Sequence, residues 1–225
     1  MRFFSVSCGI FVVCFYVWGS LAAQAADTVS VIQARYEKLR SFSATFEQTL
    51  THKESGSVEK RQGTLLFRKP LLIRWETARP HEETLVVTDR EIWNHLPDEA
   101  VVYRYPLELV QDSRSIIQVI TGQAALTKDF DVRQEERENG LTRLRLYPKE
   151  PAPQMVEALL WVEPETGYIR QARLVDFYGN TNEVRFIRFQ PDAALEPSRF
   201  RFQPPQGVEV EDRTGSSVQE RELFR

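Results

Sequence analysis

Residues 63–95 read GTLLFRKPLLIRWETARPHEETLVVTDREIWNH, and this stretch decides the class of fold. Apolar and charged residues alternate in four short runs, at residues 64–68, 72–77, 84–88 and 91–94. In the second run Ile73 and Trp75 project to one side, whereas Arg74 projects to the other. Breaks rich in proline, aspartate or charge separate the runs. The pattern predicts an antiparallel meander with one apolar face and one charged face.

The first 25 residues are typical of a secretory signal. Arg2 precedes an uncharged, mostly apolar run at residues 3–18, and an AQA sequence ends at Ala25. The run of about sixteen residues is shorter than the roughly twenty that span a bilayer, which favours cleavage after Ala25 over an uncleaved anchor. Both cysteines fall inside this segment, so residues 26–225 contain no disulfide or thiolate.

Residues 26–225 are expected to form a single domain, because about 200 residues can bury one sizeable core. Without Arg2 they carry 28 Lys and Arg against 32 Asp and Glu. This mild acidity favours solubility and argues against nucleic acid as a partner.

The remaining elements extend the sheet on both sides of the meander. Helical spacing predicts a helix at residues 27–39, capped by Asp27 or Thr28. A second helix is expected at residues 107–121, capped by Asp112 or Ser113 and ended by Gly122. Residues 53–61 are predicted as a turn and 211–225 as a polar extension. Further strands are expected at residues 41–51, 100–105, 130–135, 141–147, 157–163, 168–178 and 182–189.

The predicted fold is therefore mainly β, with about 11 strands in one antiparallel sheet that curls toward a barrel or splits into two layers. Two helices are too few to cover such a sheet as a second full layer. We expect them inside the curve or across its mouth.

No catalytic signature is present, so we expect neither an enzyme nor a bound cofactor or metal. The chain has no phosphate-binding glycine loop, HExxH, GxSxG or CxxC motif. The group at residues 81–83 (HEE) could ligate a metal, but a solvated loop explains it better. Asp89 and Glu91 could act as paired carboxylates, but a hairpin turn explains them better. What remains is a set of apolar residues that could form a core or a binding surface: Phe42, Phe46, Phe67, Ile73, Trp75, Leu85, Val87 and Trp93.

Short motifs along most of this length resemble the outer-membrane lipoprotein carrier family (LolA). The resemblance covers residues 41–210, and it rests on the order and spacing of eight segments. They are FSATFEQ (42–48), GTL (63–65), KP (69–70), IRW (73–75), LVVTD (85–89), IW (92–93), DFYGN (176–180) and FRFQPPQGV (200–208).

The resemblance implies an unclosed antiparallel β-barrel whose concave apolar face is lidded by helices. It also implies a monomeric periplasmic chaperone that takes lipoproteins from an ATP-driven inner-membrane complex to an outer-membrane acceptor. On this basis the cavity wall is matched by Phe46, Trp75, Leu85, Val87 and Trp93, with Phe42, Phe67 and Ile73 of the apolar set as further candidates. A lid helix is matched by Ile116, Ile117, Val119 and Ile120. Lys69 stands where an arginine commonly latches that lid, with Arg68 as a possible substitute.

Two alternatives remain open. A related half-barrel acceptor or sensor would bind lipid with other partners, although an acceptor normally carries a lipidated N-terminal cysteine. An acyl hydrolase in the same concavity would need a nucleophile and base that the sequence does not bring together.

Overall fold

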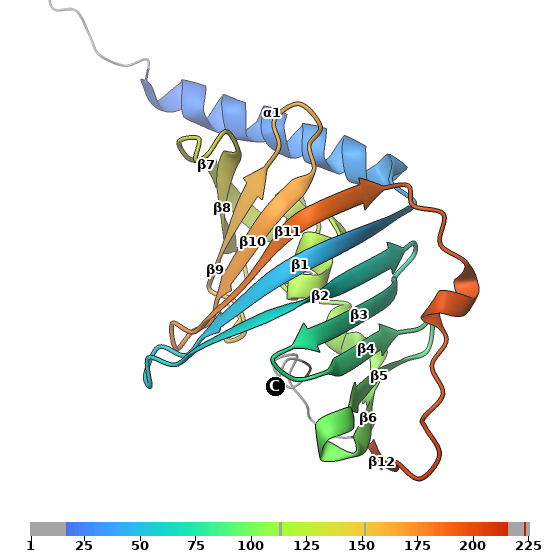
Figure 1. Cartoon of the computed structure of the whole chain (residues 1–225). Helices are drawn as coiled ribbons and strands as arrows, with labels where there is room; N and C mark the ends of the chain where they lie inside the picture. The colour runs from blue at the N-terminus through green and yellow to red at the C-terminus, as the bar shows by residue number, and fades with distance from the viewer. Residues whose placement is uncertain (1–16, 113, 151, 216–222, 224–225) are drawn as a thin grey trace, which may run out of the picture.

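A single twelve-stranded sheet forms the body of the protein (Figure 1). The computed structural model describes residues 17–112, 114–150, 152–215 and 223. The strands lie in the order β12-β6-β5-β4-β3-β2-β1-β11-β10-β9-β8-β7, so β12 and β7 are the two ends and the sheet is not closed into a barrel. All neighbouring pairs are antiparallel except β12 with β6.

The first half of the sheet is a meander of six strands, as the alternation of residues 63–95 predicts. Its strands are β1 (Ser41–Thr51), β2 (Val58–Arg68), β3 (Leu72–Arg79), β4 (Glu83–Val87), β5 (Glu91–Leu96) and β6 (Val101–Pro106). The second half comprises β7 (Phe130–Gln134), β8 (Thr142–Pro148), β9 (Glu157–Val162), β10 (Ile169–Val175) and β11 (Thr181–Pro191). Because β11 returns to pair with β1, the two meanders form one continuous surface.

Two sequence expectations about strands are wrong. Residues 58–61 continue β2 instead of forming a turn, since they pair with the far end of β1. The polar segment after residue 208 contributes β12 (Glu209–Asp212), which pairs in parallel with β6. Its residues are largely exposed and show no apolar alternation in the sequence. Main-chain pairing and an ion pair between Arg104 and Asp212 hold the strand on β6.

The helices are longer or more broken than expected. Helix α1 (Val17–Lys38) begins ten residues before the predicted cap at Asp27, so neither Asp27 nor Thr28 caps it. Residues 1–16 of the predicted signal lie outside the described residues. The second predicted helix is divided into a 3-10 turn, η2 (Leu107–Val110), and helix α2 (Ile116–Ile120). The short helix α3 (Leu126–Asp129), which the sequence analysis missed, lies directly before β7 in the chain.

The core lies on the concave side of the sheet. Ile73 and Trp75 point into it and are buried, whereas Arg74 on the same strand is half-buried on the outer face. Helix α1 contributes Val29 and Ile32 to the same core, and α2 packs against β10. Figure 1 shows α2 behind the sheet and α1 across one edge of it. The concave face is thus closed by helices.

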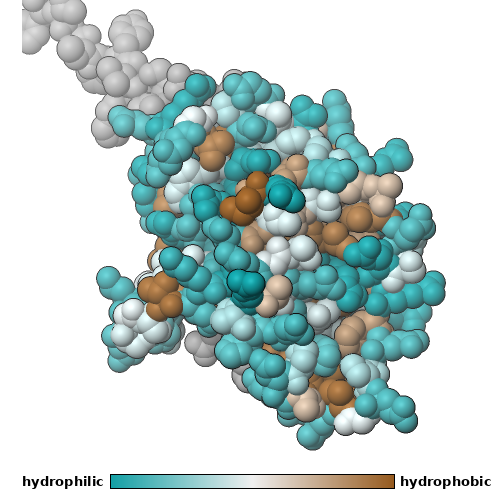
Figure 2. Space-filling model, viewed as in Figure 1, coloured by the Kyte–Doolittle hydropathy of each residue, from teal (hydrophilic) through white to brown (hydrophobic). Residues whose placement is uncertain are grey.

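The outer face carries charge pairs and the return of the chain towards β12. Arg68 donates from Nη1 to the carbonyl of Leu195 at 2.7 Å, and Arg74 donates to the carbonyl of Arg199 at 3.4 Å. The 3-10 turn η3 (Pro197–Phe200) therefore lies across the outside of β3. Figure 2 shows this face as mostly hydrophilic, with apolar residues in separate small patches.

Candidate functional site

The wall of the candidate site is the apolar part of the concave face. Cross-strand register places Phe42 opposite Phe67, Phe67 opposite Ile73, and Ile73 opposite Val87. The next row joins Trp75 to Leu85, with the rings of Phe46 and Trp75 4.6 Å apart. The sequence analysis assigned eight residues to this wall. Seven of them are buried in one continuous cluster: Phe42, Phe46, Phe67, Ile73, Trp75, Leu85 and Val87.

Trp93 does not belong to this wall, and its assignment there is wrong. Strand β5 presents Ile92 and Asn94 to the concave side, so Trp93 lies between them on the outer face. There its ring stands 5.8 Å from that of Phe202, in the segment that crosses the outside of the sheet. The run containing Trp93 was too short for its apolar residues to reveal which face was buried.

Helix α2 lies on the concave side of the sheet, where it packs against β10 and belongs to the same buried cluster as the wall. Its five residues are all buried, and they include the predicted lid residues Ile116, Ile117, Val119 and Ile120. Ser115 caps the helix by accepting a hydrogen bond from the backbone N–H of Gln118 at 3.0 Å. The predicted cap at Asp112 is wrong, and Ser113 lies outside the described residues. Asp112 instead pairs with Arg114, and this interaction lowers the pKa of the carboxyl group.

Lys69 holds a helix, but not the predicted one. Its Nζ donates to the backbone carbonyls of Tyr36 at 2.6 Å and Glu37 at 2.8 Å, which belong to the last turn of α1. The last carbonyls of a helix have no partner within it and carry partial negative charge, so an ammonium group satisfies both needs. The predicted latch between Lys69 and residues 107–121 is therefore wrong. Arg68 does not replace it, since it binds Leu195 on the outer face.

Tyr36 connects the latched end of α1 to α2. Its hydroxyl accepts a hydrogen bond from the backbone N–H of Ile169 at 3.1 Å, and burial raises the pKa of the phenol. Its ring lies so close to Gly122, directly after α2, that a Cβ at that glycine would come within 2.2 Å of ring carbons. Gly122 also has a φ of +66°, which favours glycine. The end of α1 therefore packs closely against the turn that follows α2.

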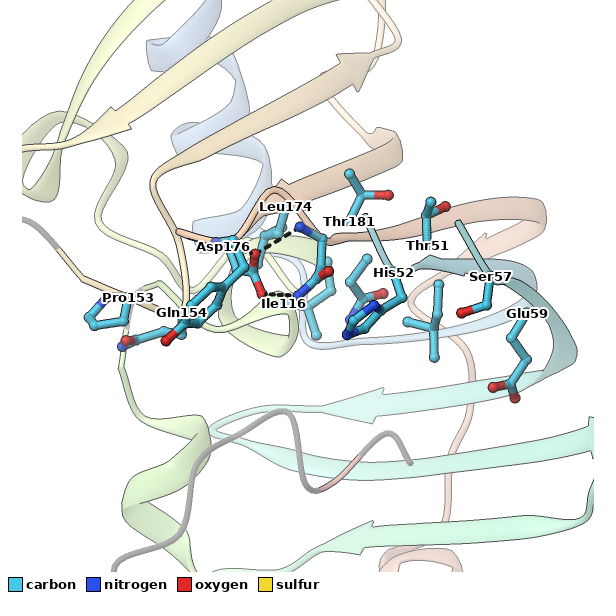
Figure 3. Close-up of a pocket in the computed structure, with 14 residues that line it drawn as sticks. Thr51, His52, Ser57, Glu59, Ile116, Pro153, Gln154, Leu174, Asp176 and Thr181 are labelled. Atoms are coloured by element: carbon cyan, nitrogen blue, oxygen red, sulfur yellow. Dashed lines mark hydrogen bonds between the residues drawn. The ribbon is translucent and has the colours of Figure 1, made fainter. Parts of the chain in front are cut away.

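A cleft of about 540 Å³ opens at the other end of the sheet, away from α1 (Figure 3). The β1–β2 hairpin, the β10–β11 hairpin and the start of α2 surround it. Ile116 is the one predicted lid residue among its lining residues, which otherwise include Leu50 and Leu174 as apolar members. The cleft therefore leads from solvent to the edge of the lid.

A band of buried polar side chains crosses the concave face beside this cleft. This polar band consists of Gln48, Arg61, Thr77, Glu83 and Asn94. Arg61 binds Glu83 at 2.9 Å, and Asn94 donates from Nδ2 to the other oxygen of Glu83 at 2.9 Å. Burial raises the pKa of Glu83. The sequence analysis missed this band, because Arg61 fell in a predicted turn.

A metal site would need several His, Cys, Asp or Glu side chains close together. Within residues 17–112, 114–150, 152–215 and 223, no three His, Cys, Asp or Glu side chains gather as metal ligands. His81 pairs with Asp98 at 2.9 Å on the surface, and Glu82 is exposed, which agrees with a solvated loop for these two residues. The prediction is wrong for Glu83, which begins β4 and is buried in the polar band.

The family model for the outer membrane lipoprotein carrier protein LolA matches residues 37–203 of this chain. The chain belongs to the LolA family. An outer-membrane lipoprotein carrier protein of Proteus mirabilis is 30% identical to it over 87% of this chain and 93% of the relative. One from Salmonella paratyphi A is 27% identical over 94% and 98%.

One solved structure has a fold similar to that of this chain. An uncharacterized conserved protein from Thermus thermophilus matches with a TM-score of 0.55 and 14% identity, over 84% of this chain and 99% of that one. This similarity bears on the fold alone. In the part of the chain that the structure describes, no helix has the length and apolar content needed to cross a membrane.

Proposed function

We propose that this protein binds the acyl chains of lipoproteins on its concave face and carries them through the periplasm to an outer-membrane acceptor. The observation that carries the proposal is the continuous apolar wall of β1–β4, which shares one buried cluster with a short helix of buried residues, in a LolA-family chain. The wall residues are Phe42, Phe46, Phe67, Ile73, Trp75, Leu85 and Val87, and the lid residues are Ile116, Ile117, Val119 and Ile120.

The burial energy of the lid is comparable to that of one acyl chain, so cargo can displace the lid. Uncovering the four apolar lid residues costs at most roughly 6–12 kcal/mol, at about 1.5–3 kcal/mol for each side chain. An acyl chain of about fifteen methylenes contributes about 12 kcal/mol on burial. One chain therefore roughly balances the lid, whereas the two or three chains of a lipoprotein exceed it. The lid thus favours multiply acylated cargo over single-chain lipids.

The proposed route of the cargo is supported by two features. The relatives are named outer-membrane lipoprotein carrier proteins, and this chain has no motif for binding a nucleotide. The work of extracting a lipoprotein from a bilayer therefore comes from an ATP-driven inner-membrane complex. Residues 1–25 act as the export signal, and residues 26–225 act as a monomeric carrier without catalysis of their own.

Binding of a synthetic triacylated lipopeptide to residues 26–225 tests the proposal. Isothermal titration should detect binding to the parent chain, and Ile117→Asp should weaken it at least tenfold, because a carboxylate on the lid opposes burial against acyl chains. Ile187→Asp is the matched control, since Ile187 lies on β11 and is 46% exposed.

A folding measurement and a second variant separate loss of binding from loss of structure. Circular dichroism checks that Ile117→Asp is folded, and Ile117→Ala, which removes apolar area without adding charge, should weaken the lid and leave binding intact. Equal affinity of the parent chain and a folded Ile117→Asp variant would contradict the proposal. Turnover of the lipopeptide esters would instead support an acyl hydrolase.

A further inference from the structure

The polar band is an unusual feature of an otherwise apolar wall. Arg61, Glu83 and Asn94 are each at most 5% exposed, and two hydrogen bonds link them in series. Buried polar groups of this kind are costly unless every donor and acceptor finds a partner. Their presence inside a cavity for acyl chains therefore needs a reason other than acyl binding.

Several acceptor atoms of the band have no partner. Among the described residues, Gln48 Oε1, Thr77 Oγ1 and Asn94 Oδ1 are buried and receive no hydrogen bond. The amide of Asn94 is oriented by its neighbours, since the carboxylate of Glu83 requires the Nδ2 donor. A ligand that suits this site must present N–H or O–H donors. A peptide main chain does so, whereas the methylenes of an acyl chain do not.

One residue of the C-terminal segment already occupies the neighbourhood of the band. Leu223 is fully buried and belongs to the same apolar cluster as the wall of β1–β4. Its backbone carbonyl accepts a hydrogen bond from Asn94 Nδ2 at 3.3 Å. A peptide carbonyl and a branched apolar side chain are thus bound side by side on the concave face.

The band is also connected to the open cleft. Gln48 donates to Asn182 at 2.9 Å, and Arg61 donates to Glu59 at 2.6 Å. Asn182 and Glu59 both line the cleft. A polar path therefore runs from solvent to the buried band, along which a peptide could enter beside the acyl chains.

We propose that the polar band is a peptide-binding subsite of the cavity, which the chain's own Leu223 occupies in this closed form and which the peptide part of a cargo takes over. This inference rests on the proposed function and deepens it, since it assigns a site to the part of a lipoprotein that is not lipid. Leu223 and the cargo peptide compete for the same apolar space and the same Asn94 amide.

Removal of the occupant tests the competition. Residues 26–215 and residues 26–225 are titrated with a synthetic triacylated lipopeptide and with dipalmitoylglycerol, which lacks a peptide. The shorter chain should bind the lipopeptide about tenfold more tightly, because burial of one leucine is worth at least that factor. Leu223→Ser in the full chain should act in the same direction, and Val210→Ala, at an exposed position of β12, should not. Equal lipopeptide affinities would overturn the inference.

Asn94→Leu in the shorter chain tests the chemistry of the subsite. It should weaken binding of the lipopeptide about fivefold, the value of one hydrogen bond, and leave binding of dipalmitoylglycerol unchanged. Equal loss for both ligands would contradict recognition of peptide. A failure of every folded variant to bind either ligand would instead overturn the proposed function, and this inference with it.

Discussion

Replacement of Lys69 by methionine should loosen the end of α1 and, through it, the lid. The change removes two hydrogen bonds, of 2.6 and 2.8 Å, from an ammonium group to the carbonyls of Tyr36 and Glu37. Buried hydrogen bonds to a charged group contribute about 1.5–3 kcal/mol each. Because the contact to Glu37 is exposed, solvent screens part of this, and we expect a total of about 1–2 kcal/mol.

Hydrogen exchange followed by mass spectrometry measures this effect locally. A loss of 1–2 kcal/mol should speed exchange in residues 35–39 about 5- to 30-fold. A smaller increase should appear in residues 116–122, because the Tyr36 ring packs against Gly122. Lys69→Arg should retain most of the protection, since guanidinium can reach the same carbonyls.

Lys60→Met is the matched control, because it removes the same charge from an exposed position of β2. Unchanged exchange at residues 35–39 in Lys69→Met would refute the latch on α1. Faster exchange in the lid alone would refute the order of events, in which Lys69 acts through Tyr36.

Two further predictions concern the lid and its approach. Gly122→Ala should lower the melting temperature by much more than Gly140→Ala does. Both glycines have a positive φ, but only Gly122 faces the ring of Tyr36. Equal decreases in melting temperature would contradict the close packing of Tyr36 on Gly122. Asp112→Asn should destabilise the protein by less than about 1 kcal/mol near neutral pH, since the half-exposed pair with Arg114 lowers the pKa of Asp112. The difference from the parent chain should persist above the ordinary pKa of aspartate and vanish as the pH falls through the lowered pKa, and denaturant titrations that show no such pH dependence would contradict this.

The sheet was largely predictable because alternation with a period of two is a local property. Strand β1 was predicted to the residue, and Ile73 and Trp75 were assigned to the correct face. Strand β12 was not predictable in this way, because its residues are largely exposed and the strand forms only by pairing with the distant strand β6. Gly122 gave the end of α2 because a positive φ there is a local requirement.

The contacts of the candidate site depend on distant partners, and the sequence predicted them less well. Lys69 gains its partners because the end of β2 lies beside the end of α1. The resemblance to a family therefore identified Lys69 as a residue that holds a helix, but it named the wrong helix. Trp93 was misplaced because an apolar residue in a short strand fits either face. Leu223 lies in a mostly polar segment, and its burial depends on the distant residues of the core cluster, which the sequence does not place beside it.

Photolabelling with a lipopeptide that carries diazirines in its acyl chains tests the central claim most directly. Mass spectrometry of the labelled chain should place the label on concave residues of β1–β4 and on α2, with Phe46, Trp75 and Ile117 among them. Trp93 on the outer face and the exposed Phe177 should remain unlabelled. Label confined to those two positions, with none on the concave wall, would contradict an acyl-binding cavity beneath the lid.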